Sequence, residues 1–170
     1  MGLEIEQQLR SIGALLLGRS WMLVTAESCT GGGVAQAVTS MPGSSRWFDR
    51  GFVTYSNLSK QQMLGVPAAL LQEFGAVSEP VVRAMAEGAL HNSAAQVSLA
   101  ISGIAGPGGG SADKPVGTVW FAWAVSGGTT VSHCRWFNGD RAQIRAQAVQ
   151  AALIGVLDIL STDNDIDERG

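Results

Sequence analysis

The sequence predicts an α/β fold: a three-layer α/β/α sandwich built on a mixed, largely parallel sheet. Helical patterns alternate with short apolar runs along most of the 170 residues, which is typical of helices that cover both faces of a sheet. The runs are almost entirely apolar, as in strands that are buried on both faces. Two late runs joined by residues 126–128 (SGG) indicate a hairpin, so part of the sheet is antiparallel.

The first half of the chain is predicted to alternate between helices and strands. Apolar residues recur at helical spacing near the N-terminus, and Gly18 follows them as a helix stop. In chain order, we expect a helix over 4–18, a strand over 21–26, a helix over about 30–40, a strand over 51–56 and short helices over 57–64 and 67–74.

The second half carries the hairpin and the longest helix. Ser78 is a good N-cap and Pro80 suits a first helical turn, so a helix is expected to begin there. We then expect a strand over 97–102, a loop over 103–115, strands over 116–125 and 129–137, and a last helix to about residue 160. These elements form a single domain over residues 1–160, and the polar, acidic tail at 161–170 is predicted to be disordered.

Composition excludes several classes of partner. A net charge of −3 provides no basic surface for nucleic acid. The two cysteines and two histidines lie far apart in sequence, so neither a metal site nor a disulfide framework is expected. The acidic N-terminus lacks a signal peptide and no apolar run approaches membrane-spanning length, so we expect a cytoplasmic protein with no membrane partner.

The apolar content points to self-association. Hydrophobic residues make up 46% of the chain and charged residues only 15%, and the sequence includes five tryptophans. One small core hides only part of such apolar surface, so we expect a homodimer or higher homo-oligomer.

Polar or glycine-rich sequence follows three of the predicted strands. These stretches are residues 27–30 (ESCT), 55–57 (YSN) and 102–106 (SGIAG). If the three strands are parallel neighbours, their carboxyl ends converge on one crevice, which is where open α/β sheets place their sites. The loop at 103–115 contains neither a P-loop nor a dinucleotide-binding motif, but loops of this length in a compact domain usually serve a site.

Residues 26–33 (AESCTGGG) carry the most informative pattern. A strand that passes through such a turn into a helix directs backbone N–H groups at one point, which suits a phosphate or an oxyanion. We expect Ser28 to be a nucleophile, and Thr30 and Gly31 to line the substrate site. The alternative is a structural turn in which a hydroxyl caps the helix. Cys29 is the alternative nucleophile, although no histidine lies near it in sequence.

Lys60 is one of only two lysines, and it lies five residues after Tyr55. A buried amine beside a serine would accept the hydroxyl proton, as in Ser–Lys catalysis; the alternative is a solvated surface lysine. Arg141 and Arg145 lie four residues apart on one face of the last helix and would suit a phosphate or carboxylate, unless both face solvent.

Six stretches taken together form a recognisable series. They are 26–32 (AESCTGG), 43–48 (GSSRWF), 51–57 (GFVTYSN), 75–80 (GAVSEP), 102–110 (SGIAGPGGG) and 114–119 (KPVGTV). In this order they closely resemble the CinA C-terminal-domain family, named for competence/damage-inducible proteins, over residues 5–158. The chain resembles the stand-alone form of that family.

The resemblance implies an activity and a set of residues. Active members hydrolyse the amide of nicotinamide mononucleotide to nicotinate mononucleotide and ammonia in pyridine nucleotide salvage, and they need no cofactor or metal. Ser28 matches the nucleophile, and Lys60 and Tyr55 match the groups that activate it. The residues that match substrate-binding positions are Ser45, Ser102 with Gly103, and Arg141; many members have Thr at position 102. The alternative is a silent member that acts as a nucleotide-binding or sensing module, or as an interaction module in competence or DNA damage.

Overall fold

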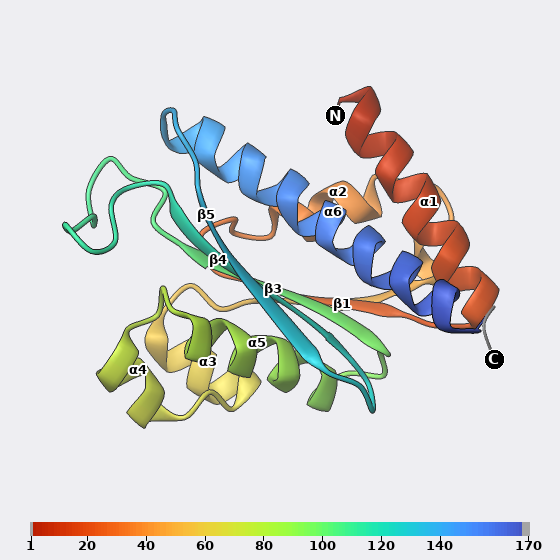
Figure 1. Cartoon of the computed structure of the whole chain (residues 1–170), viewed down its shortest axis with the longest axis horizontal. Helices are drawn as coiled ribbons and strands as arrows, with labels where there is room; N and C mark the ends of the chain where they lie inside the picture. The colour runs from red at the N-terminus through yellow and green to blue at the C-terminus, as the bar shows by residue number, and fades with distance from the viewer. Residues whose placement is uncertain (1, 168–170) are drawn as a thin grey trace.

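A five-stranded sheet lies between two layers of helices in the computed structural model, which describes residues 2–167, with side chains through Thr162 (Figure 1). The elements are α1 (Leu3–Arg19), β1 (Leu23–Glu27), α2 (Gly33–Thr39), the 3₁₀ turn η1 (Ser44–Arg46), β2 (Phe48–Val53), α3 (Asn57–Leu64), α4 (Ala68–Phe74), α5 (Glu79–His91), β3 (Val97–Gly103), β4 (Thr118–Val125), β5 (Thr130–Trp136) and α6 (Arg141–Asp167).

The strand order is β2-β1-β3-β4-β5. Strand β1 is parallel to both of its neighbours, β2 and β3, while β4 is antiparallel to β3 and β5 is antiparallel to β4. The predicted mixed sheet is confirmed, but only half of its pairings are parallel, because the chain returns from β3 to β4 through a loop without a crossover helix. The carboxyl ends of β2, β1 and β3 therefore meet at one edge, as the sequence predicted.

The two helical layers have different members. Helices α1, α2 and α6 cover one face of the sheet, and α3, α4 and α5 cover the other (Figure 1). Every residue of β1 is buried, which explains why its sequence is an apolar run rather than an alternating one. Each face has its own core cluster, one around Leu99, Phe121 and Leu153 and one around Val24, Val82 and Met85.

Several predicted boundaries shift by one to three residues, and two elements differ for a clear physical reason. Strand β2 begins at Phe48 and ends at Val53, three residues earlier than expected, since it is an edge strand that carries polar residues instead of an apolar run. Helix α6 continues through Asp167, past the expected end near 160 and into the segment predicted to be disordered. The hydroxyls of Ser161 and Thr162 donate to carbonyls four residues earlier, so these polar side chains fit inside the helix. Residues 168–170 lie outside the described residues.

Helix α6 contradicts the expectation that no apolar run in the chain approaches membrane-spanning length. By length and composition alone, its segment Arg141–Thr162 would be able to cross a membrane. Its buried residues Ile144, Ala148, Ala152 and Val156 belong to the core cluster on this face of the sheet. The apolar composition of α6 is thus accounted for by its place in the core.

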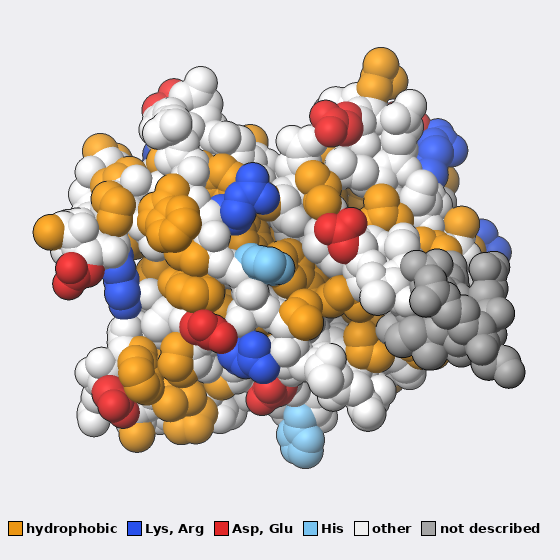
Figure 2. Space-filling view, viewed as in Figure 1, with side chains coloured by type: hydrophobic (Ala, Val, Ile, Leu, Met, Phe, Trp, Pro, Cys, Tyr) orange, Lys and Arg blue, Asp and Glu red, His pale blue; other side chains and the backbone are white. Residues whose placement is uncertain are grey.

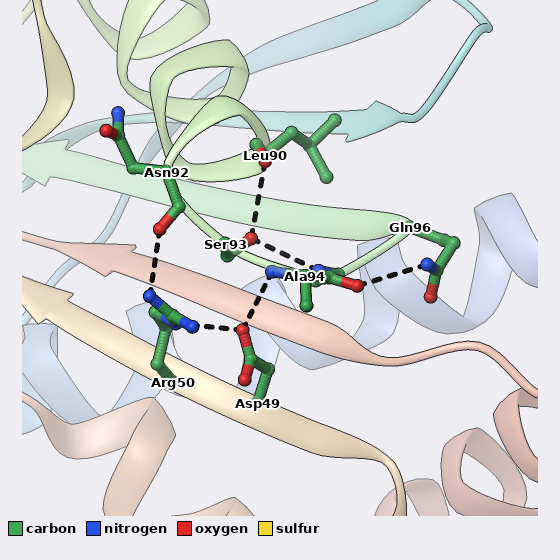
Figure 3. Close-up of polar contacts among 8 residues, drawn as sticks. Asp49, Arg50, Leu90, Asn92, Ser93, Ala94 and Gln96 are labelled. Carbon is green, nitrogen blue, oxygen red and sulfur yellow. Dashed lines mark hydrogen bonds and ion pairs between the residues drawn. The ribbon is translucent and has the colours of Figure 1, made fainter.

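Polar contacts fix the end of the sheet opposite to the predicted site (Figure 3). The Asp49 carboxylate on β2 accepts from Arg50 Nε at 2.8 Å and from the N–H of Ala94 at 3.0 Å, and Arg50 donates to the Asn92 carbonyl at 3.1 Å. These bonds tie β2 to the connection between α5 and β3. This end of the sheet therefore has a structural role.

Close packing of α3 on α5 depends on one glycine. A Cβ built on Gly88, inside α5, would lie only 1.9 Å from the carbonyl oxygen of Leu64 at the end of α3. Gly88 therefore allows α3 to approach α5, and α3 carries Lys60.

We predict that Gly88→Ala lowers the free energy of unfolding by at least about 2 kcal/mol, because backbone atoms would have to move. The matched control is Gly18→Ala in α1, where the added Cβ meets nothing within 4 Å. That change should stabilise the protein by about 0.5–1 kcal/mol through helix propensity. Urea denaturation of both variants checks this, and equal stabilities would contradict it.

Candidate active site

A cleft of about 220 Å³ opens at the carboxyl ends of β2, β1 and β3. Its lining comes from all three strand ends and from α3, the segment before α5, and α6. The lining residues are Ser28, Cys29, Tyr55, Asn57, Lys60, Ala76, Val77, Ser102, Gly103, Ala105 and Arg141. The sequence prediction that the three strand ends form one crevice is confirmed.

Ser28 and Lys60 meet inside this cleft. Ser28 follows the last residue of β1, and the Lys60 side chain reaches it from α3, placing Lys60 Nζ 3.0 Å from Ser28 Oγ. Lys60 Nζ also donates to the carbonyl of Thr54 at 2.7 Å, just after β2. The Lys60 side chain is only 1% exposed, so it is not a solvated surface lysine.

Local sequence explains why Lys60 points inward. Ser56 and Ser59 form a reciprocal capping box at the N-terminus of α3, and Gly65 ends the helix in the left-handed conformation. The helix is fixed at both ends, and its buried residues are Lys60 and Leu64, four positions apart on one face.

Burial lowers the pKa of Lys60 from the ordinary lysine value, because the charged ammonium loses hydration inside the protein. No carboxylate pairs with Lys60 among the described residues. Its polar contacts there are the Thr54 carbonyl and the Ser28 hydroxyl. A neutral amine satisfies both, since it donates to the carbonyl and accepts the hydroxyl proton of Ser28.

Cys29 lies beside Ser28 but has the wrong protonation state for a nucleophile. Burial raises the pKa of the Cys29 thiol to about 11, which keeps it protonated near neutral pH. A Cβ on Gly103 would lie 3.1 Å from Cys29 Sγ and 2.7 Å from Val119. Gly103, which was expected to bind substrate, lines the cleft. Only a glycine fits at this position, because Cys29 and Val119 pack so close to its Cα.

Tyr55 and Arg141 lie at the rim of the cleft. Arg141, at the start of α6, donates to the Tyr55 hydroxyl and to the Gly106 carbonyl, both at 2.9 Å. The Tyr55 side chain is 63% exposed. Its hydroxyl therefore bonds Arg141 rather than Ser28, the nucleophile that Tyr55 and Lys60 were expected to activate.

Ser102 lines the cleft but has a structural partner. Its hydroxyl donates to the carbonyl of Ala76 at 2.7 Å, and Lys114 Nζ donates to the Phe74 carbonyl at 2.7 Å. Both bonds hold the segment between α4 and α5 against the site. Ser102 has only acceptor capacity left for a substrate.

Neither Thr30 nor Gly31 is among the residues that line the cleft, and Thr30 lines the hollow between α1, α2 and α6. Thr30 Oγ1 donates to the buried carboxylate of Glu27 at 2.7 Å, and that carboxylate also accepts from the N–H groups of Val34 and Ala35 at the start of α2. Gly31 has a left-handed φ of +59° and lies beside Arg145. The capping role left open for this turn is thus filled by Glu27.

Ser45 does not reach the cleft of its own chain. It is exposed in η1, just before β2, and the neighbouring Trp47 carbonyl accepts from the N–H of Leu23 at the start of β1. Ser28 lies at the other end of β1. Strands β1 and β2 run parallel, so the segment before β2 lies beside the start of β1. The length of β1 therefore separates Ser45 from Ser28.

Two residues that sequence reasoning did not assign, Thr54 and Glu27, also shape the site, and Arg145 binds the protein's own carbonyls rather than only offering itself to an anion. The Thr54 carbonyl holds Lys60, Glu27 holds the turn, and Arg145 donates from Nε to the Cys29 carbonyl at 3.1 Å and from Nη2 to the Thr30 carbonyl at 3.3 Å. Glu27 carried a signal, since a carboxylate at a strand end shortly before a predicted helix suits the N–H groups at the start of that helix. A backbone carbonyl such as that of Thr54 carries none.

Two larger hollows lie elsewhere. One, of about 470 Å³, lies between α1, α2 and α6, and another, of about 490 Å³, lies between β5 and α6. Neither lining includes a nucleophile paired with a base among the described residues. The part of the chain with described side chains contains no cluster of metal-ligating residues.

Comparison with known proteins identifies the family. The model of the CinA C-terminal domain matches residues 5–160. The chain belongs to the CinA C-terminal domain family. The resemblance carried by the six motifs is thereby confirmed, and the CinA C-terminal domain accounts for all but the ends of the chain.

Curated relatives carry an activity in their names. The nicotinamide-nucleotide amidohydrolase PncC of Enterobacter agglomerans is 54% identical over 142 residues, covering 84% of this chain and 87% of its own length. The PncC of Escherichia coli K12 is 53% identical over 150 residues, covering 88% of this chain and 91% of its own length.

A solved CinA C-terminal domain has the same fold. The competence/damage inducible protein CihA from Agrobacterium tumefaciens superposes with a TM-score of 0.89 at 45% identity, covering 95% of this chain and 99% of that one. The similarity spans nearly the whole length of both chains.

We predict that the two thiols differ in reactivity. Burial raises the pKa of both thiols, but Cys29 is only 6% exposed with its pKa raised to about 11, whereas Cys134 on β5 is partly exposed. An aromatic disulfide reagent at pH 8 should react quickly with one thiol and with the second only after denaturation. Cys134→Ser should remove the fast phase. A fast phase that persists in Cys134→Ser would contradict the burial of Cys29.

Proposed function

We propose that this chain is a nicotinamide-nucleotide amidohydrolase, which converts nicotinamide mononucleotide to nicotinate mononucleotide and ammonia. The observation that carries the proposal is the buried contact of 3.0 Å between Lys60 Nζ and Ser28 Oγ. A serine paired with a neutral amine is an acyl-transfer nucleophile with its base. Relatives more than 50% identical bear the name of this activity.

The first chemical step forms an acyl-enzyme. Ser28 Oγ attacks the carboxamide carbon of the substrate as its proton passes to Lys60 Nζ. Lys60, now an ammonium, returns that proton to the amide nitrogen, and the C–N bond breaks to release ammonia. The Thr54 carbonyl keeps Lys60 aligned throughout, because it accepts a different N–H of the same amine.

In the second step, water is the nucleophile and Ser28 is the leaving group. Neutral Lys60 takes a proton from a water molecule, which attacks the acyl carbon, and Ser28 leaves with that proton. The products are free nicotinate mononucleotide and regenerated enzyme. No metal or redox group is needed, since the reaction changes no oxidation state and the amine supplies the base.

Arg141 suits the substrate's phosphate at the cleft rim. Its guanidinium has five N–H donors and uses Nη1 and Nη2 on Gly106 and Tyr55, so donors remain for an anion. Tyr55 presents its exposed ring beside this arginine. The two residues thus act here as substrate-binding groups, with Lys60 as the base.

A second function has one observation in its favour. Arg141, Tyr55 and the cleft would bind a nucleotide whether or not turnover follows, so a sensing module remains the alternative. Ammonia release by the pure protein distinguishes the two. A protein that binds nicotinamide mononucleotide without releasing ammonia would be the sensor.

Ser28→Ala is expected to abolish ammonia release and to change the free energy of unfolding by no more than about 1 kcal/mol, since only one hydroxyl is lost. Cys29→Ala is the matched control at the adjacent position and should retain most activity. A coupled ammonia assay with a thermal melt measures both. An active Ser28→Ala enzyme together with a dead Cys29→Ala enzyme would assign the nucleophile to the thiol.

Activity should rise with pH along a limb that lies below the ordinary lysine range. Below its lowered pKa, Lys60 is charged and cannot accept the Ser28 proton; above that pKa it is neutral and can. Lys60→Arg keeps the charge but cannot deprotonate, so it should be as inactive as Lys60→Ala while still binding nucleotide. An active Lys60→Arg enzyme would reduce Lys60 to an electrostatic role.

We also propose that the chain forms a homo-oligomer, most simply a C2 dimer. Hydrophobic side chains are exposed on the face over β5 and α6 (Figure 2), where Val131 and Ile154 are each 40% exposed. Strand β5 is also an edge of the sheet, with free backbone groups that a second copy would pair.

Light scattering should give a mass at least twice the 17.7 kDa of one chain. Ile154→Glu should shift the protein toward monomer, because a charge would be buried at the interface. Leu58→Glu, at a 59% exposed site on α3, is the control and should leave the mass unchanged. A monomer at every concentration would exclude the proposal.

A further inference from the structure

The turn that follows Ser28 is held from two sides. From the inside, the Glu27 carboxylate accepts the Thr30 hydroxyl at 2.7 Å. From the outside, the Arg145 guanidinium donates to the carbonyls of Cys29 at 3.1 Å and Thr30 at 3.3 Å. These charged contacts fix the orientation of two successive peptide groups, and bonds from a charged donor are stronger than neutral ones.

Two buried backbone donors in this turn, the N–H groups of Cys29 and Thr30, donate to no acceptor of another residue in the described part of the chain. Thr30 is only 1% exposed. The N–H of Gly31 is already used, since it donates to the Ser28 carbonyl at 3.0 Å. Buried N–H groups are almost always paired, so unpaired ones beside a nucleophile indicate an acceptor that arrives with the substrate.

Peptide geometry sets the direction of that donor. In a trans peptide the C=O and N–H bonds point in opposite directions. The carbonyl of the Cys29–Thr30 peptide points to Arg145, so the Thr30 N–H of the same peptide points away from Arg145. Arg145 and Thr30 both line the hollow between α1, α2 and α6, whereas Ser28 and Cys29 line the cleft, so the direction away from Arg145 leads toward the Ser28 side of the turn.

We propose that Arg145 is a positioning residue for catalysis: it holds the Cys29–Thr30 peptide so that the Thr30 N–H donates to the oxyanion of the tetrahedral intermediate. The positive charge on the carbonyl side also polarises the peptide and strengthens the N–H as a donor. Arg145 touches neither substrate nor Ser28 and acts only through this peptide. The inference rests on the proposed amide hydrolysis.

The sequence around the turn fits this role. Gly31 has a φ of +59°, and a Cβ there would lie 3.3 Å from Arg145 Nη2. A glycine thus gives the guanidinium access to both carbonyls. Arg141, one turn earlier on α6, instead reaches the cleft rim, so the two arginines of this helix serve different parts of one site.

The test compares Arg145→Ala with wild type for hydrolysis of nicotinamide mononucleotide. Removing one oxyanion donor lowers kcat about 100- to 1,000-fold. Arg145→Ala displaces the donor without removing it, so part of the oxyanion stabilisation remains. We therefore expect kcat to fall about 10- to 100-fold with KM little changed. The pH limb should stay in place because Lys60 is untouched. Added guanidinium ion should restore part of kcat. Arg10→Ala, which removes an exposed side chain on α1, is the control and should match wild type.

The outcomes are distinguishable. No ammonia from wild type defeats the proposed function itself. With an active wild type, an unchanged kcat in Arg145→Ala, a loss confined to KM, or no response to guanidinium overturns the role of Arg145. If Arg145→Ala fails to fold, Arg145→Lys replaces it: the ammonium lacks the planar fork of the guanidinium that fixes both carbonyls in one geometry, so kcat should fall with KM unchanged. Full kcat in a folded Arg145→Lys would overturn the role.

Discussion

The contact between Lys60 Nζ and Ser28 Oγ is the interaction on which the rest of the site depends. A lysine that is 1% exposed and lacks a carboxylate partner among the described residues lowers stability, because the amine must give up its charge or its hydration. The same burial lowers the pKa of the amine, so its neutral, basic form is present at lower pH than in an ordinary lysine. The Thr54 carbonyl, the α3 capping box and the close packing of Leu64 on Gly88 all hold Lys60 in this environment.

The sheet supplies the other half of the arrangement. Because β1 lies between two parallel neighbours, the turns after β2, β1 and β3 meet at one edge. Helix α3 follows β2 after a short connection, which brings its lysine over Ser28. The last helix closes the site from the opposite face, where Arg141 reaches the rim and Arg145 reaches the nucleophile turn. Both layers of helices therefore contribute to one small cleft.

Much of this was predictable from sequence, for reasons that particular residues make clear. The place of Ser28 was predictable because a strand-end position is visible in the chain, whereas the role of Lys60 followed from the family resemblance, since its pattern alone left a solvated surface lysine open. The bonding partners were not: the Ser102 hydroxyl donates to a backbone carbonyl, Tyr55 bonds Arg141, and Thr30 turns toward Glu27. Ser45 matched a motif, but the topology places it at the far end of β1. Edge strand β2 and the polar end of α6 lacked the apolar pattern that sets boundaries.

The most direct measurement of the central claim is an NMR titration of the lysine side chains. The chain has only two lysines, so ¹³Cε-lysine labelling gives two signals, and Lys60→Arg assigns them. The account predicts that the Lys60 signal titrates below the ordinary lysine range in the resting protein, since burial lowers its pKa. A Lys60 signal that stays in its protonated position up to the ordinary lysine pKa would contradict a neutral amine at Ser28, and with it the assignment of Lys60 as the base.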